Sequence, residues 1–217
     1  MKAVPAGPAT GEAHLHPLRR QGVRLKKVVV EKKTRILNDF FKVDEAHLRF
    51  EKFDGQMSSS VRRLSLERGD SVAVLIFNPE TRTLFLTNQF RYPTLEKGPG
   101  WMIEVVAGAI DKDESPEAAA RREVLEESGF DLVKLEPVST FYVSPGGTSE
   151  RIVLYYAEVT ARSKVGSGGG LASEAEDIET VALTIDEALE QVRSGQIIDA
   201  KTIVGVFWLQ NRLKAAG

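Results

Sequence analysis

The segment from Gly108 to Phe130, GAIDKDESPEAAARREVLEESGF, constrains this chain more than any other. It predicts a helix whose two ends are both marked in the sequence. Ser115 is suited to the N-cap and Pro116 to the first helical turn. Gly129 is suited to the C-terminal stop, because glycine tolerates the left-handed conformation common there. The segment therefore predicts a turn at Gly108 followed by one well-delimited helix.

Three carboxylates share one face of this predicted helix. At about 100° per residue, Glu123, Glu126 and Glu127 fall within an arc of roughly 100°. Val124 and Leu125 fall outside that arc and predict a drier side. Like charges at this spacing repel by a few tenths of a kcal/mol per pair, so a solvated acidic face is one interpretation. The other is a site for hard divalent cations, which prefer oxygen ligands.

The same segment resembles the Nudix box at every specified position. The matching positions are Gly108, Glu114, Arg122, Glu123, Val124, Glu126, Glu127, Gly129 and Phe130. The residues 101–107, WMIEVVA, predict a strand that leads directly into Gly108, which is the context the motif requires. The resemblance implies a Mg²⁺-dependent hydrolase of nucleoside diphosphates linked to another group, with Mn²⁺ as a possible substitute.

Composition excludes several other classes. A chain of 217 residues suits one domain, or one domain with an added subdomain. A net charge of −2 gives no basic field for nucleic acid or an anionic membrane, and no segment has the length of a membrane span. The absence of cysteine is compatible with a cytoplasmic location. We expect residues 1–22 to form a flexible tail, in which His14 and His16 do not suffice for a metal site.

The remaining pattern predicts an α+β protein, a Nudix α/β/α sandwich with a mixed sheet. The domains expected are a tail at 1–22, an N-terminal β dimerisation subdomain at 23–69 and a Nudix hydrolase domain at 70–217. Strands are predicted at 23–31, twice within 39–69 around a turn at Asp54-Gly55, and at 71–77, 83–90, 101–107, 132–142, 152–160 and 178–183. Two further helices are predicted, from the Thr184 cap to Arg193 and over 200–214.

Several stretches outside the box resemble ADP-ribose pyrophosphatases, over roughly residues 40–209. They are FDGQMS at 53–58, VRR and LERG within 61–69, QFR at 89–91, SPGGTSER at 144–151 and GLASEAEDI at 170–178. This branch implies hydrolysis of ADP-ribose to AMP and ribose 5-phosphate. The run Gly168-Gly169-Gly170 also occurs in relatives that cleave GDP-mannose or UDP-sugars, so a broader NDP-sugar pyrophosphatase is the alternative. A non-catalytic nucleotide-binding regulator is disfavoured, because all four box glutamates are present.

The resemblance also implies roles for individual residues. The metal ligands would be the Ala107 carbonyl, Glu123, Glu126 and Glu127. Glu114 and Arg122 would orient the ligands, and Glu174, or else Glu176, would be the general base after the flexible-looking loop at 163–173. Substrate contacts would come from Phe40, Arg63, Arg91, Ser144, Pro145 and Gly146. Phe40 would stack on the base from the partner subunit of a homodimer, whereas a surface ion pair is the alternative for either arginine.

Overall fold

The computed structural model describes residues 25–216, except for the side chains of Glu174 and Ala216. The predicted tail at 1–22 and the pair His14 and His16 lie outside the described residues. Within the part that is described, no helix is both long and apolar enough to cross a membrane. The cytoplasmic location stays a prediction.

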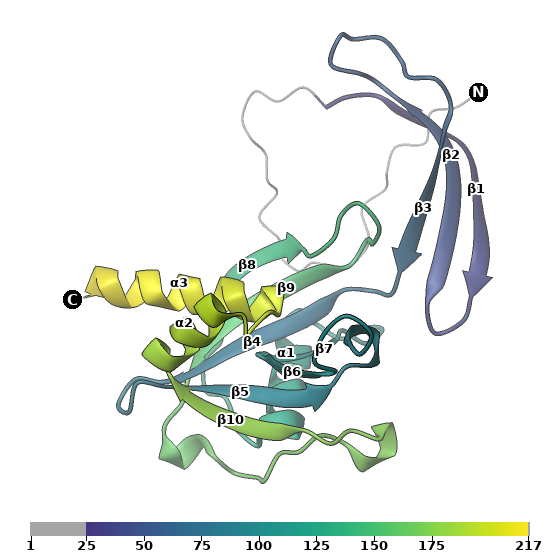
Figure 1. Cartoon of the computed structure of the whole chain (residues 1–217). Coiled ribbons are helices and arrows are strands. Elements are labelled where there is room, and N and C mark those ends of the chain that lie inside the picture. The colour runs from purple at the N-terminus through teal and green to yellow at the C-terminus, as the bar shows by residue number, and fades with distance from the viewer. Residues whose placement is uncertain (1–24, 217) are drawn as a thin grey trace. The chain divides into compact units, whose positions relative to one another are not determined.

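The chain divides into two compact units (Figure 1). The first contains the residues up to Gly69 together with Ser144–Glu150, and the second contains Asp70–Val143 and Arg151–Gly217. The boundary at Gly69 falls where the predicted domains 23–69 and 70–217 meet. The loop Ser144–Glu150 groups with the first unit, although we expected it in the larger domain.

The first unit is an antiparallel sheet in the order β1-β2-β3. Its strands are β1 (Val28–Asn38), β2 (Lys42–Phe50) and β3 (Val61–Glu67). The predicted turn at Asp54-Gly55 lies between β2 and β3, with Gly55 at a φ of 83°. The loop Ser144–Glu150 is joined to this sheet by a backbone hydrogen bond, in which Leu66 N donates to Gly147 O at 2.8 Å. The strand predicted at 23–31 starts later and runs further than expected.

The second unit contains a seven-stranded sheet in which β10-β5-β4-β9-β8 lie in order, β6 pairs with β5 and β7 pairs with β4. The strands are β4 (Ser71–Asn78), β5 (Thr83–Phe90), β6 (Trp101–Glu104), β7 (Val106–Ala109), β8 (Glu136–Tyr142), β9 (Arg151–Glu158) and β10 (Glu179–Thr184). The pair β4 and β9 is parallel, and the other pairs are antiparallel. The sheet is therefore mixed, as expected.

The helices are α1 (Pro116–Glu123), α2 (Ile185–Ser194) and α3 (Ala200–Ala216), with single 3₁₀ turns at Tyr92–Thr94, Ala161–Ser163 and Ala172–Glu174. α1 and α2 begin at their predicted caps, and α2 ends at its predicted glycine. Thr184 and Glu187 form the predicted capping box of α2, which ends at Gly195 with a φ of 76°. The Ser115 side chain caps α1 by accepting from Ala118 N at 3.2 Å.

Alternation along β4 builds a core on each face of the sheet, because successive side chains of a strand point to opposite faces. Leu75 and Phe77 pack with α2 and α3, whereas Val74 and Ile76 pack with α1. All four side chains are buried. The α/β/α sandwich and the α+β class are thus confirmed, and the apolar run of β4 reflects its cover on both faces.

The strand predicted at 101–107 is interrupted. Val105 separates β6, which pairs with β5, from β7, which pairs with β4. The Val105 N–H leaves the sheet ladder and donates to Thr202 Oγ1 at 2.8 Å. The chain thereby crosses from one neighbour strand to another just before it reaches Gly108, and the N-terminal turn of α3 supports the crossing.

Candidate active site

The acidic motif lies on the predicted strand, turn and helix. β7 contains Gly108, where a Cβ atom would overlap the Glu123 carboxylate, so glycine leaves the space that this carboxylate occupies against the strand. After α1 the backbone widens into a π-helical turn, Val124–Ser128, which ends at Gly129 with a φ of 65°. Val124 is buried but Leu125 is 47% exposed, so the predicted dry side is right for Val124 and wrong for Leu125.

Arg122 lies at the centre of the acidic motif. Its Nη2 and Nε donate to the two oxygens of Glu114 at 3.0 and 3.1 Å. Its Nη1 donates to Glu123 Oε1 at 2.8 Å and to Glu126 Oε2 at 3.2 Å. Nη2 also donates to the Ala109 carbonyl at 3.2 Å. One guanidinium therefore connects the acid before the helix, two acids on it and the strand beneath it.

These contacts and burial act on the acids in opposite directions. The hydrogen bonds from Arg122 lower the pKa of Glu114 below its usual value. Burial raises the pKa of Glu123; Arg122 opposes the shift, and the neighbouring charges of Glu126 and Glu176 add to it. The motif thus contains both an acid that is easily ionised and one that resists ionisation.

Glu127 is the most deeply buried of the box acids, at 2% exposure. Its Oε2 has no hydrogen-bond partner within the described residues. Burial, followed by the nearby charge of Glu123, raises the pKa of Glu127 to about 8, although Arg91 acts against the shift. A buried carboxylate oxygen that lacks a donor is suited to a bound cation, which would favour its ionised form.

The donor set therefore fits a hard divalent cation. Ala107 lies on β7, Glu123 on α1, and Glu126 and Glu127 on the π turn that follows it. Carboxylate and carbonyl oxygens are the ligands such ions prefer. Within the described residues, no three acids or histidines are already arranged as a metal-binding group. In this arrangement Arg122 is the counter-charge of Glu123 and Glu126.

A cleft of about 540 Å³ lies in the same unit as this motif. It is lined by Gln89, Phe90, Arg91, Trp101, Ala175, Glu176 and Asp177. The rings of Phe90 and Trp101 are 5.0 Å apart, and both are partly exposed. One wall thus offers aromatic faces, and Arg91 adds a cation. The predicted base candidate Glu176 and the predicted substrate contact Arg91 both line this cleft.

The loop before Glu176 packs against the end of the acidic motif. Gly169 N donates to Glu127 O at 2.9 Å, and Gly170 N donates to Glu126 O at 3.1 Å. The Glu176 carboxylate accepts from Leu171 N at 2.9 Å. Its charge contributes to the raised pKa of both Glu123 and Glu127, which places it near them. The side chain of the other base candidate, Glu174, is not among those described.

The remaining predicted contacts belong to the first unit. Phe40 is 83% exposed, between β1 and β2, and its ring makes an edge contact with Phe41 at 4.9 Å. Arg63, on β3, is exposed and donates only to the Arg62 carbonyl among its described neighbours. Ser144, Pro145 and Gly146 form a turn in which Gly147 N donates to Ser144 O. Their roles at the active site stay predictions.

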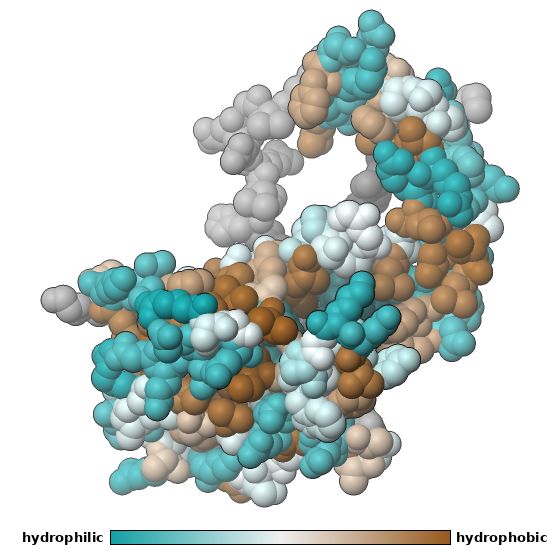
Figure 2. All heavy atoms as spheres, in the orientation of Figure 1, coloured by the Kyte–Doolittle hydropathy of each residue, from teal (hydrophilic) through white to brown (hydrophobic). Residues whose placement is uncertain are grey.

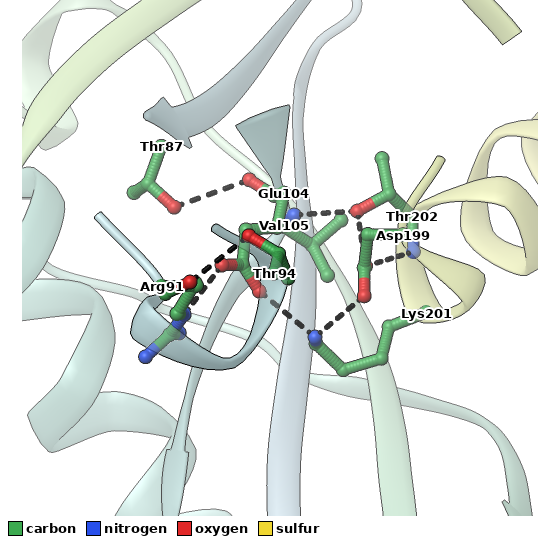
Figure 3. A network of polar contacts seen from close by, with 8 residues as sticks. All are labelled: Thr87, Arg91, Thr94, Glu104, Val105, Asp199, Lys201 and Thr202. Atoms are coloured by element: carbon green, nitrogen blue, oxygen red, sulfur yellow. Dashed lines mark hydrogen bonds and ion pairs between the residues drawn. The ribbon is translucent and has the colours of Figure 1, made fainter. Parts of the chain in front are cut away.

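Sequence reasoning missed four residues of the second unit that bear on the cleft. Gln89 is 6% exposed and lines the cleft, and its Nε2 has no hydrogen-bond partner in the described chain. Glu104, Asp199 and Lys201 form a buried polar network behind Arg91 (Figure 3). An acid within the apolar strand sequence WMIE was the one available signal, since an acid there requires buried partners.

Comparison with known proteins supports the motif assignment. Residues 67–203 match the NUDIX domain. An ADP-ribose pyrophosphatase of Escherichia coli (strain K12) is 40% identical over 174 residues, which are 79% of this chain and 82% of that protein. A GDP-mannose pyrophosphatase of Cronobacter sakazakii (strain ATCC BAA-894) is 41% identical over 161 residues, 73% of this chain and 82% of that one.

A solved structure described as an ADP compounds hydrolase shares the fold. Its TM-score is 0.69 at 19% sequence identity, and the match covers 90% of this chain and 98% of that one. The match extends over nearly the whole chain, whereas the family model spans residues 67–203. The predicted resemblance is therefore confirmed by the box, the sandwich and the relatives together, and the chain belongs to the Nudix family of hydrolases.

Proposed function

We propose that this hydrolase cleaves the pyrophosphate bond of ADP-ribose, giving AMP and ribose 5-phosphate, and that it uses Mg²⁺. The observation that carries the proposal is the combination of a buried Glu127 oxygen, which has no hydrogen-bond partner in the described part of the chain, with a cleft that contains Arg91. The first suits a divalent cation and the second suits a phosphate. The ADP-ribose pyrophosphatase at 40% identity supports this choice of substrate.

Different residues of the cleft are suited to different parts of the substrate. Arg91 provides charge for the diphosphate, and Gln89 Nε2, which has no hydrogen-bond partner among the described residues, provides a donor for a phosphate or sugar oxygen. Phe90 and Trp101 provide apolar faces for a ring. Arg122 holds Glu123 and Glu126 on the side that faces β7, so that the acids are oriented before ligands bind.

A divalent cation bound by the acids would neutralise the diphosphate and lower the pKa of a water molecule. A carboxylate of this chain must then accept the proton of the attacking water. We propose Glu174 for this role on the family resemblance, with Glu176 as the second candidate. Glu176 lines the cleft and is fixed by the Leu171 N–H, which also suits it to a positioning role.

GDP-mannose is the second candidate substrate. The GDP-mannose pyrophosphatase at 41% identity and the run of three glycines at 168–170 favour it. UDP-glucose belongs to the same class. The two readings share the reaction and differ only in the base and sugar that the substrate carries.

A homodimer formed by the first unit completes the proposal. Its sheet exposes many apolar side chains, and Figure 2 shows brown, apolar atoms on its surface. The exposed apolar residues of β1 and the turn after it are Val28, Val29, Val30, Ile36, Leu37, Phe40 and Phe41. Water contact of so many large apolar side chains is unfavourable, so a second copy is the partner that we propose.

The test is a product assay over ADP-ribose, GDP-mannose, UDP-glucose and ADP-glucose, with Mg²⁺ and with EDTA. Chromatography of the products identifies the bond that is cleaved. We expect ADP-ribose to give the highest kcat/KM and to yield AMP. A higher kcat/KM for GDP-mannose would transfer the assignment to the second candidate, and release of intact ADP would exclude pyrophosphate cleavage.

A further inference from the structure

Four side chains of alternating charge form a chain behind the wall of the cleft (Figure 3). Arg91 Nε lies 2.6 Å from Glu104 Oε1, and Lys201 Nζ lies 2.9 Å from Glu104 Oε2. Lys201 Nζ also lies 2.8 Å from Asp199 Oδ1. Arg91 follows β5, Glu104 ends β6 and the other two residues are at the start of α3. Three distant segments therefore meet in one polar chain.

Arg91 is the most exposed of the four side chains and Glu104 is the most buried. The side chain of Glu104 is 4% exposed and that of Lys201 is 15% exposed, whereas Arg91 is 39% exposed and lines the cleft. Burial alone would lower the pKa of Lys201, but Glu104 and Asp199 outweigh it and the pKa lies above its usual value. Lys201 is thus a buried ammonium group, and replacing it leaves Glu104 with one cation instead of two.

The end of this polar network at Asp199 and Lys201 is fixed by the first turn of α3. Asp199 Oδ2 accepts from Thr202 N at 2.9 Å and from Thr202 Oγ1 at 2.7 Å, which caps the helix. Thr202 Oγ1 in turn accepts from Val105 N at 2.8 Å. The N-terminal dipole of α3 favours the negative charge of Asp199. The position of Lys201 is therefore set by the same turn that supports the break between β6 and β7.

The sharing of Glu104 fixes Arg91 at one nitrogen. Glu104 accepts from Nε of Arg91, and neither terminal nitrogen of that guanidinium has a hydrogen-bond partner among the described residues. Lys201 donates to the other oxygen of Glu104 and to Asp199, so the carboxylate that holds Arg91 is itself fixed by the start of α3. A phosphate can then contact the terminal nitrogens of a guanidinium that is already held in place.

We propose that Lys201 and Glu104 are positioning residues, which fix Arg91 at Nε and leave its terminal nitrogens for the diphosphate of the substrate. The inference rests on the proposed function, in which Arg91 contacts a phosphate. Lys201 does not touch the substrate in this arrangement. Its effect must therefore pass through Arg91, and this dependence separates it from a residue that only stabilises the fold.

The experiment is a double-mutant cycle between Lys201→Met and Arg91→Ala, measured on the full chain. We expect Lys201→Met to raise KM for ADP-ribose about 10-fold with a smaller change in kcat. In the Arg91→Ala background the same substitution should change kcat/KM less than about twofold, because its target is gone. Lys201→Arg should recover most of the loss.

Arg212→Met is the matched control. Arg212 also joins α3 to the sheet, through an ion pair with Glu136 on β8, at the opposite end of the strand order from β5 and β6. We expect this variant to lose some stability and to keep the KM of the parent. If Lys201→Met does not fold, Lys201→Gln keeps a hydrogen-bond donor without the charge, and the same cycle is measured with it.

Calorimetric binding of ADP, measured without turnover, separates the two hypotheses. The positioning role is supported if Lys201→Met binds ADP more weakly than the parent does, while the double variant binds ADP as tightly as Arg91→Ala alone. The positioning role is overturned if the effects of Lys201→Met and Arg91→Ala on ADP binding multiply in full in the double variant. It is also overturned if Lys201→Met has the KM of the parent. A parent protein that binds ADP and cleaves no NDP-sugar refutes the proposed function, and the binding cycle still decides the role of Lys201.

Discussion

Replacing Glu127 by glutamine should remove a pH-dependent loss of stability from the metal-free protein. The Glu127 carboxylate is 2% exposed and one of its oxygens has no partner in the described chain. Burial is the main cause that raises its pKa from 4.5 to about 8. The uncharged form is thus favoured in the folded protein, and glutamine copies its shape without being able to ionise.

The sign and the size follow from linkage. Because the folded pKa lies above the unfolded one, the stability that Glu127 contributes is complete below about pH 4.5 and is lost as the pH rises through about 8. At about 1.4 kcal/mol per pKa unit, the loss is at most about 5 kcal/mol. Glu127→Gln should therefore unfold less easily than the parent at about pH 8.5 in EDTA, and the advantage should vanish at about pH 5.

Urea unfolding in EDTA, followed by tryptophan fluorescence from about pH 5 to pH 9, measures this difference. Glu117→Gln is the control, because Glu117 lies exposed in the first turn of α1 and pairs only with Arg121 among the described residues. Adding Mg²⁺ at about pH 8 should stabilise the parent and not Glu127→Gln, since binding requires the ionised acid. Equal pH slopes for the parent and Glu127→Gln would refute the reasoning.

Four further outcomes are expected. EDTA should abolish hydrolysis and Mg²⁺ or Mn²⁺ should restore it, so turnover by the metal-free protein would exclude the proposed mechanism. Glu174→Gln should lower kcat by about 10²–10⁴ with KM nearly unchanged, and Glu176→Gln should do much less; the reverse pattern would make Glu176 the base. Phe40→Ala should mainly raise KM, because stacking contributes binding shared by ground and transition states, and a lower kcat alone would contradict this. Deleting residues 1–20 should leave a dimer in sedimentation and deletion through Gly69 should not; a fully active monomeric parent would contradict the shared site.

Local signals in the sequence predicted the ends of the elements well. Ser115, Thr184 and Gly195 are caps whose side chains or backbone conformations serve one turn of helix, so no distant partner is needed to recognise them. The continuous apolar run of β4 likewise predicts burial on both faces of the strand, because a strand covered on both faces needs no polar side. These features account for the α/β/α layers and for the place of the acidic motif.

Features set by distant contacts were not predictable in the same way. The break at Val105 depends on a hydrogen bond from its N–H to Thr202, on α3. A helical repeat of 3.6 residues also could not foresee the π turn at Val124–Ser128. Nor could it foresee that the side of the helix with Glu127 faces the core and that Leu125 is exposed. The fold can be inferred from local patterns, but the partners of Arg91 require the tertiary structure.

The glycines of the loop at 163–173 serve close packing and not only flexibility. Such a run suggests flexibility, yet Gly168 and Gly170 have positive φ, and a Cβ at either would overlap neighbouring atoms. The space is occupied by the backbone that ends the acidic motif and by Glu176. The glycines therefore allow the loop to donate two backbone hydrogen bonds to the carbonyls of the π turn. Because the same loop positions Glu176 at the cleft, an alanine at 168 or 170 would displace a carboxylate of the site while leaving every acid in the sequence.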